Sequence, residues 1–339
     1  METIKKYKES ILLFFIALIS LFLSPLSSTR FLNFSFKSLA YIFLFILVEE
    51  GIKKENLLLP LFRLLNSIRT TGFLTFVLVL SSFVLSFFIY PIILLSLVIP
   101  FVVKLIKVSN KEKYKNRILS LILLASLTSS LISPFSNMAN YIEYTESSSS
   151  ILHALLIPFL LSLLILIAET GLVIKKMQGD EIYLHIEDEE YWDNERKGIR
   201  IFYLAFFVVL FFATRFNAID FFLVVLVALL LFDRKLFKGL NYNLVFSTLF
   251  LFVIRDSLLN TQLSNAPRFV MSLLSLVMGR IVTVSFSPKI GLGALFLLSY
   301  PLCYITNKIE KEERKSFLKT YYSFSLPFFL SLFLLIYFV

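Results

Sequence analysis

The stretch GFLTFVLVLSSFVLSFFIYPIILLSLVIPFVV, residues 72–103, decides the fold class of this chain. It is one apolar run of 32 residues without a charged side chain. A helix that crosses a bilayer needs about 20 apolar residues, so this run is too long for one crossing and short for two. Pro91 lies past its middle, where proline removes a backbone donor and clashes with the previous helical turn. The run therefore predicts a helical hairpin inside a membrane.

The composition of the whole chain is typical of a polytopic integral membrane protein. Of its 339 residues, 58% are apolar, 17% are charged and 39 are Phe, whereas soluble domains average about 25% charged residues. A soluble globule cannot bury so many large apolar side chains and keep a wettable surface. The same figures exclude fibrous, disordered and disulfide-stapled proteins. Cys303 is the only cysteine, so an internal disulfide is excluded.

Further apolar runs follow along the chain, and polar residues interrupt one of them. Residues 118–148 begin with ILSLILLASLTSSLI and continue with SPFSN, where Pro134 stands among Ser133, Ser136 and Asn137. This pattern predicts a helix that unwinds part-way. Unwound backbone at membrane depth survives only where it is buried in protein or lines a wet cavity, and such breaks point to a transport site. The other predicted membrane runs are 11–28, 36–51, 151–174, 199–214, 217–232, 243–260, 268–288, 289–306 and 321–339.

The placement of Lys and Arg predicts the orientation. The net charge of +10 is concentrated in short segments between the apolar runs, as in cytoplasmic membrane loops, so we expect no nucleic-acid partner. All basic segments are cytoplasmic only if residues 72–103 enter and leave on the inner side. The same rule makes 268–288 a second re-entrant element, which enters from the outer side. The N-terminus is then cytoplasmic and the C-terminus outside. The basic segments are 5–8, 52–70, 104–117, 175–198, 233–240 and 307–319.

Two hairpins that enter from opposite faces indicate an inverted repeat. IPFLLSLLILI (157–167) matches LPFFLSLFLLI (326–336) at seven of eleven positions, and residues 31–51 resemble residues 239–257 with a one-residue gap. We therefore predict an all-α membrane protein with two inverted repeats and about nine spans plus two hairpins. Its predicted parts are an N-terminal helix (1–30), a first repeat (31–174), an acidic cytoplasmic linker (175–198), connecting helices (199–232) and a second, inverted repeat (233–339).

This order of elements resembles the ion transporter superfamily, in particular its arsenite-permease and citrate-transporter-like branch. The most specific stretch is SPFSNMANYI (133–142), which is similar to the family's unwound T-P-x-G-N-P-x-N segment. Residues 70–102 resemble the first family hairpin, and residues 272–288 resemble the second. LSYPLCYI (298–305) stands where the second broken segment is expected, without its Gly and Asn.

The resemblance implies a substrate site between the broken helices and the hairpin tips. SPFSNMAN offers hydroxyls, side-chain amides and backbone N–H groups, the donors that a partly dehydrated anion needs. Arg280 lies in an apolar run, where a charge is expensive and faces a cavity or a partner. We expect it to attract an anion or to replace a coupling cation; the alternatives are a pair with Asp256 or a side chain that snorkels to an interface. The predicted site residues are Ser86, Ser133, Ser136, Asn137, Asn140, Arg280 and Ser299.

The function implied is that of a secondary active permease for a small anion, working by alternating access in the lipid bilayer. The alternatives are a non-transporting structural or assembly subunit and a channel. A coupling Na⁺ or proton, a separate ATPase subunit and a homodimer stay open, and no further cofactor is expected.

We expect no enzyme, because GxSxG, HExxH, P-loop and dinucleotide motifs are missing from the sequence. The carboxylates of residues 179–198 are interpreted as part of a solvated linker, and Glu169 as an interface residue.

Overall fold

The computed structural model is helical in the part of the chain that it describes. This part comprises residues 8–24, 68–134, 150–182, 197–216, 219–240, 242–259, 292–297 and 309–338, with residues 40, 43–44, 46–48, 50–51, 54–55, 136–137, 140, 299, 301–302 and 305–306. Three helices are long and apolar enough to cross a membrane, namely Thr71–Phe88, His153–Lys176 and Arg314–Leu335. The predictions of a helical fold and of membrane association are thus confirmed. The predicted hairpin 268–288, with Arg280, lies outside the described residues.

The chain divides into two compact units, which are described one at a time. The first unit is Met1–Lys54, Met138–Ile151 and Ile199–Gly291, and the second is Glu55–Asn137, Leu152–Gly198 and Leu292–Val339. The first holds the helices α2 (Lys8–Leu23), α11 (Lys197–Phe216), α12 (Ile219–Phe232), α13 (Arg234–Gly239) and α14 (Tyr242–Leu259). The second holds α6 (Thr71–Phe88), α7 (Pro91–Val108), η3 (Glu112–Tyr114), α8 (Lys115–Ser130), α10 (Ser150–Lys176), α17 (Ala294–Leu297) and α19 (Arg314–Phe338).

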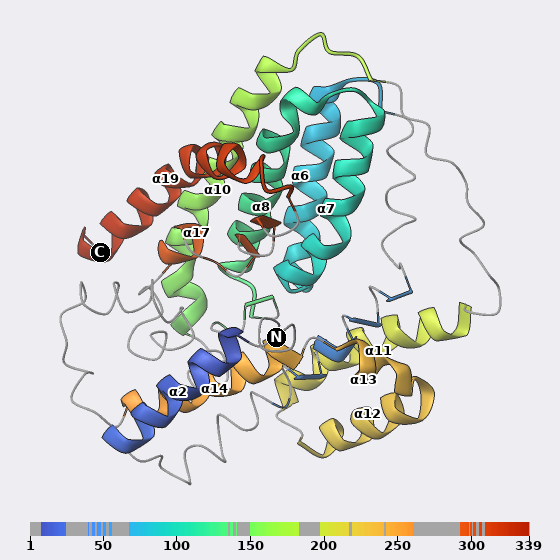
Figure 1. Cartoon of the computed structure of the whole chain (residues 1–339), viewed down its shortest axis with the longest axis vertical. Coiled ribbons are helices and arrows are strands. Elements are labelled where there is room, and N and C mark those ends of the chain that lie inside the picture. The colour runs from blue at the N-terminus through green and yellow to red at the C-terminus, as the bar shows by residue number, and fades with distance from the viewer. Residues whose placement is uncertain are drawn as a thin grey trace. The chain divides into compact units, whose positions relative to one another are not determined.

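In the second unit, α6 and α7 form a helical hairpin with a two-residue break (Figure 1). Helix α6 begins at the N-cap Thr70, whose hydroxyl accepts the N–H of Phe73 at 3.4 Å. It ends before Ile89 and Tyr90, which are extended, because a proline disfavours the helical conformation of the residue before it. Pro91 is then the first residue of α7, where its missing N–H costs nothing. The predicted break before Pro91 is confirmed.

Helix α8 is the central helix of this unit. Every residue from Ile118 to Ser130 is buried, and α8 packs against α6, α7, α17 and α19. The helix ends at Ser130 and continues as turns through residues 131–134, so the predicted interruption before Pro134 is also confirmed. A helix that is buried all round and rich in hydroxyl groups is typical of a membrane-protein interior, where small polar side chains let helices approach closely.

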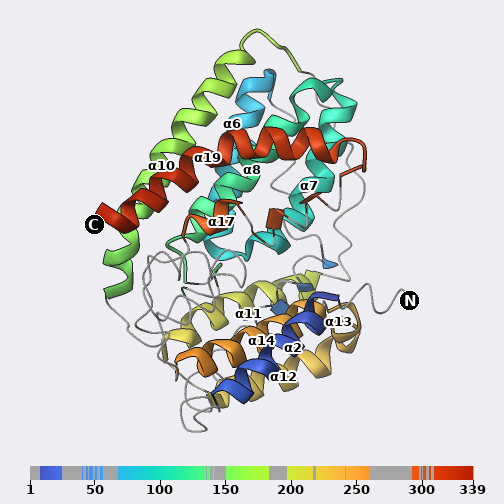
Figure 2. The same cartoon turned by 60° about the vertical axis from the view of Figure 1, so that its left-hand side comes forward.

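Two long helices enclose this centre, and each contains a proline inside its helical span. Helix α10 contains Pro158 and α19 contains Pro327. Helix α19 exposes Leu326, Leu330 and Leu334 at intervals of four residues, which is a single helical face. Figure 2 shows α19 crossing α8 and α10, and Lys115 Nζ lies 2.6 Å from Glu313 Oε2, which joins the start of α8 to the residue before α19.

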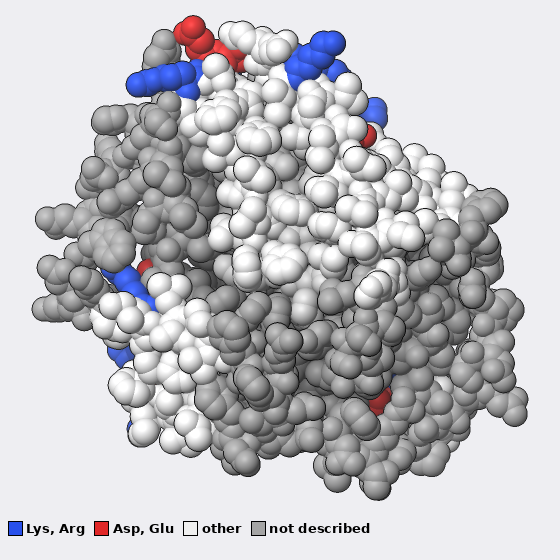
Figure 3. Space-filling model, turned by 180° about the vertical axis from the view of Figure 1, so that it is seen from behind, with Lys and Arg blue, Asp and Glu red and all other residues white. Residues whose placement is uncertain are grey.

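The basic ends of these helices come together. The ends of α6, α7, α8 and α10 that lie near Lys111 and Lys176 meet at one residue, Asp180, as described below. In Figure 3, one group of Lys, Arg, Asp and Glu side chains lies at the top of the view, and the white surface directly beneath this group is uncharged. This distribution is the one that a bilayer imposes on a helical protein, because charged groups are excluded from the hydrocarbon.

The first unit contains a tightly packed pair of parallel helices, α2 and α14 (Figures 1 and 2). Ser10 near the start of α2 contacts Asn243 near the start of α14, and the carbonyl of Ser20 near the end of α2 accepts the Ser257 hydroxyl. Between them Ala17 packs against Ile254. Each of these helices follows a basic segment, residues 5–8 and 233–240 respectively.

Candidate functional site

The break after α8 is attached to the end of α6. The Ser133 hydroxyl donates a hydrogen bond to the carbonyl oxygen of Phe87, and the same Ser133 oxygen accepts the N–H of Ser136 at 3.2 Å. The carbonyls of the last helical turn have no partner within the helix, so the Ser133 hydroxyl satisfies one of them. Ser133 is fully buried. The predicted site residues Ser86, Ser133 and Ser136 therefore lie within one small buried region, where the hairpin tip meets the unwound segment.

Several hydroxyl groups in this region are buried without using their hydrogen-bonding capacity. The hydroxyls of Ser82 and Ser86 in α6, of Thr128 and Ser129 in α8, and of Ser136 have no hydrogen-bond partner in the described structure. Their neighbours in α8 behave differently, since Ser126 and Ser130 each donate to a carbonyl of their own helix at 2.8 Å.

A buried hydroxyl without a partner costs about 1–3 kcal/mol. These hydroxyls can therefore still donate hydrogen bonds. A bound molecule that accepts hydrogen bonds from them would offset this cost.

The other predicted site residues are placed differently. Asn137 and Asn140 are buried, but they belong to the second and the first unit respectively. The Ser299 hydroxyl accepts the N–H of Leu302 at 3.3 Å, so it acts locally as a helix cap. The structure thus brings Ser86, Ser133 and Ser136 together and gives Ser299 a structural role.

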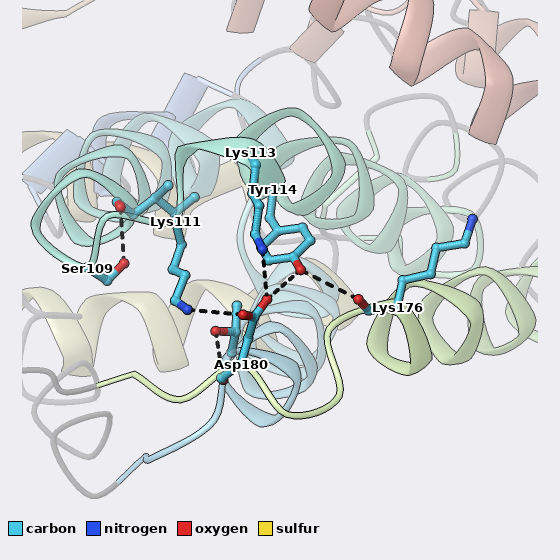
Figure 4. A network of polar contacts seen from close by, with 8 residues as sticks. Ser109, Lys111, Lys113, Tyr114, Lys176 and Asp180 are labelled. Carbon is cyan, nitrogen blue, oxygen red and sulfur yellow. Dashed lines mark hydrogen bonds and ion pairs between the residues drawn. The ribbon is translucent and has the colours of Figure 1, made fainter.

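A second polar centre lies at the basic end of the same unit (Figure 4). Asp180 forms ion pairs with Lys111 and Lys113, each at 3.3 Å, and its carboxylate accepts a hydrogen bond from Tyr114. The Tyr114 hydroxyl lies 3.5 Å from the carbonyl oxygen of Lys176 at the end of α10. The hydrogen bond from Tyr114, followed by that from Lys113, lowers the pKa of Asp180 from 3.8 to about 2. Asp180 is therefore charged at all physiological pH values.

The backbone of Asp180 completes this centre. Its carbonyl oxygen accepts the N–H of Thr71 at 2.9 Å and the Thr71 hydroxyl at 3.1 Å. Next to it, the N–H of Ile182 donates to the carbonyl of Arg69 at 2.8 Å. Asp180 thus ties together the start of α6, the connection between α7 and α8, and the end of α10. The sequence analysis assigned this residue to a solvated linker; its position four residues after Lys176, the end of α10, was the available signal.

The first unit contains a buried ion pair that the sequence analysis did not identify. Arg255 and Asp256 are 0% and 2% exposed, and Arg255 Nη1 lies 3.3 Å from Asp256 Oδ1. A charge at such a position is costly unless it is paired. Asp256 was considered in the sequence only as a partner for Arg280, although its direct neighbour is oppositely charged.

Lys54, Tyr203 and Asp233 form another polar cluster in this unit. Lys54 Nζ and the Tyr203 hydroxyl lie 2.5 and 2.8 Å from Asp233 Oδ2. Burial raises the pKa of Asp233, but the bonds from Lys54 and Tyr203 outweigh burial and hold the pKa below its ordinary value. The Tyr203 ring packs on Gly51 so closely that a Cβ there would lie 2.1 Å from Tyr203 Cε1. This cluster fixes the end of α12 within its unit.

No protein-family model matches the chain, and no curated protein matches it either.

Proposed function

We propose that this protein is a secondary active transporter that carries a small anion across the membrane by alternating access. The observation that carries the proposal is the contact between the Ser133 hydroxyl and the Phe87 carbonyl, surrounded by buried hydroxyls without partners. A helix break inside a membrane-associated bundle needs compensation, and a substrate site provides it. The site lies between the tip of the α6–α7 hairpin and the segment after α8.

The chemistry of this region supports an anion rather than an apolar substrate. Serine and threonine hydroxyls donate hydrogen bonds without bringing a negative charge. Ser82, Ser86 and Ser136 supply such donors, and their hydroxyls have no hydrogen-bond partner in the described structure. The lysines near Asp180 at the basic end of the unit favour the arrival of anions on that side.

The inverted-repeat architecture, with re-entrant hairpins, is part of this proposal. Its support comes from α10 and α19, two long apolar helices of the second unit in which Pro158 and Pro327 occupy equivalent positions of the repeated sequence. The hairpin of α6 and α7 begins and ends at the basic end, as the first repeat requires.

The test is transport by the purified protein in proteoliposomes. Uptake and efflux of arsenite, phosphate-like and carboxylate anions are measured for the unmodified protein, for Ser133→Ala and for Ser136→Ala. We expect saturable flux of at least one anion and a loss of about tenfold or more in both variants, which corresponds to about 1.4 kcal/mol. Ser323→Ala is the matched control, because Ser323 is exposed on α19 and donates to its own helix at 2.7 Å.

Two results would contradict the proposal. Absence of flux for every anion, from protein that remains folded and inserted, would favour a structural or assembly subunit. Conductance that neither saturates nor couples to an ion gradient would identify a channel instead.

A further inference from the structure

Helix α10 also carries buried hydroxyls without partners. The buried residues of α10 include Leu155, Pro158, Ser162, Leu166 and Thr170, which recur every three or four positions and so share one face. The hydroxyls of Ser162 and Thr170, which are 0% and 7% exposed, lack a hydrogen-bond partner in the described structure.

Helix α10 meets α6 at two levels. The rings of Phe159 and Phe83 lie 6.2 Å apart between their centroids, and a Cβ on Gly72 would lie 3.2 Å from Ile174 Cγ2. Thr75 of α6 contacts Met177 just beyond the end of α10. Ser162 and Thr170 lie on α10 between the levels of these contacts, which are made by Phe159 and by residues 174–177.

The same contacts establish which hydroxyls lie at the same depth. Helices α6 and α10 are antiparallel, because Gly72 meets Ile174 whereas Phe83 meets Phe159. Counting along the two helices from these contacts places Ser82 opposite Ser162. Thr170 then lies between this level and the basic end, and Ser86 lies one turn closer to the hairpin tip.

Helix α8 continues the series of hydroxyls. It runs parallel to α6, since Tyr114 and Thr71 both bind Asp180 at one end and Ser133 binds Phe87 at the other. Thr128 and Ser129 thus lie near the depth of Ser82, in a helix that packs closely on α6.

These hydroxyls could have bonded to their own helices, as other residues here do. Thr75 donates to the carbonyl of Thr71 at 2.9 Å, and Ser81 donates to that of Leu78 at 3.1 Å. Ser82 is adjacent to Ser81 and remains without a partner. Buried polar groups in native proteins are satisfied by protein or by water, and a polar site is where internal water is retained.

We propose that the seam between α6, α8 and α10 is a hydrated path that leads from the basic end to the break after α8. Water and a small anion pass Thr170, then the level of Ser82 and Ser162, and reach Ser86 and Ser133. Lys111 and Lys113 raise the local concentration of anions at the entrance. This inference rests on the proposed function and specifies the route by which its substrate arrives.

Thiol accessibility tests the path directly. In a Cys303→Ser background, the single variants Ser82→Cys, Ser162→Cys and Thr170→Cys are reconstituted into liposomes and treated with an anionic, membrane-impermeant methanethiosulfonate. We expect each of them to react at least tenfold faster than Leu160→Cys and Leu164→Cys. These matched controls lie on the outer face of the same helix, where Leu160 and Leu164 are 47% and 65% exposed. Full labelling of all five variants after unfolding in detergent shows that every thiol is intact.

Equal, slow labelling of Ser162→Cys and Leu164→Cys in folded protein would overturn the hydrated path. The measurement needs no transport, so it separates the two proposals. Fast labelling of the seam in protein that carries no anion supports the path and contradicts the transporter, whereas anion flux through protein with an unreactive seam overturns the path alone.

Discussion

The two closely packed helix pairs of this protein, α2–α14 and α6–α8, treat their buried polar groups in opposite ways. Between α2 and α14, the Ser10 hydroxyl contacts Asn243 and lies 3.2 Å from the Ser247 hydroxyl. The Ser257 hydroxyl lies 3.1 and 2.5 Å from the carbonyls of Ser20 and Ser24. Between α6 and α8, buried hydroxyls are left without a partner.

Under the proposed function, this difference separates a structural role from a substrate-binding one. In a membrane, association of helices is not driven by the hydrophobic effect, so packing and hydrogen bonds between helices hold them together. The polar side chains of α2 and α14 serve this purpose. The hydroxyls of α6 and α8 that lack a partner do not bond to each other. In the proposed function they are available to bind the substrate.

The largest expected effect concerns the buried ion pair of α14. Asp256→Leu removes the carboxylate that lies 3.3 Å from Nη1 of the fully buried Arg255. Removing one member of a buried pair costs about 3–5 kcal/mol, and we expect a loss of stability of this size in equilibrium unfolding in micelles. The double variant Arg255→Met/Asp256→Leu is the control, because it removes both charges and should recover most of the loss. If the single and double variants were equally unstable, the charge pair would not be the cause.

A smaller effect is expected for the hydrogen bonds between α2 and α14. Ser257→Ala removes the hydroxyl that binds the carbonyls of Ser20 and Ser24, and interhelical bonds of this kind contribute about 0.6–1.7 kcal/mol in a membrane. We expect the unfolding free energy to fall within this range, with anion flux unchanged apart from the lower yield of folded protein. Ser323→Ala, on the exposed face of α19, should show no change.

The charged centre at the basic end should give a smaller effect that depends on pH. The pKa of Asp180 is lowered from 3.8 to about 2, so its charged form stabilises the folded state above pH 3.8 and this contribution is lost as the pH falls toward 2. Asp180→Asn should lower stability modestly at pH 7, because the site is partly exposed to water, and the difference from the unmodified protein should vanish near pH 2.

Thermal unfolding in micelles between pH 7 and about pH 2 measures this difference, and hydrogen exchange at Thr71, whose N–H binds the carbonyl of Asp180, reports it locally. Glu312→Gln, at an exposed carboxylate near α19, is the control. A difference that persisted unchanged at the acid end would mean that the backbone contacts of residue 180, and not its charge, carry the effect.

The smallest change in stability is expected for the hydroxyl at the hairpin tip. Ser86→Ala removes a hydroxyl without a protein partner. In the proposed site, water or the anion satisfies this hydroxyl, so the unfolding free energy should change by less than about 0.5 kcal/mol. The same variant should reduce anion flux, because the hydroxyl belongs to the proposed site. A clear loss of stability would show that Ser86 holds helices together, as Ser257 does, and the contrast between the two helix pairs would disappear.

Part of this structure could be predicted because it depends on local chemistry. Pro91 and Pro134 mark helix ends through the geometry of proline and of the residue before it, and both breaks are confirmed. The membrane association follows from composition alone. The polar character of Ser133, Ser136 and Asn137 identified the segment after α8 as a candidate site for the same reason.

Other features could not be predicted, since they depend on which helices meet. The role of Asp180 requires Thr71, Lys111 and Tyr114 to converge on it, although they are up to 109 residues distant in the chain. Likewise, Ser82 and Ser81 are identical in type and adjacent, yet one bonds to its own helix and the other does not.

The amino-acid sequence by itself determined that this protein is helical, that it associates with a membrane, and where two of its helices must end, because burial of apolar surface and the geometry of proline act within a few residues. Only the tertiary structure decided that the break after α8 is held at the tip of the α6–α7 hairpin, and which buried hydroxyls have no hydrogen-bond partner. The physical reason is that a hydrogen bond depends on distances of a few tenths of an ångström between groups that only the packing of helices brings together.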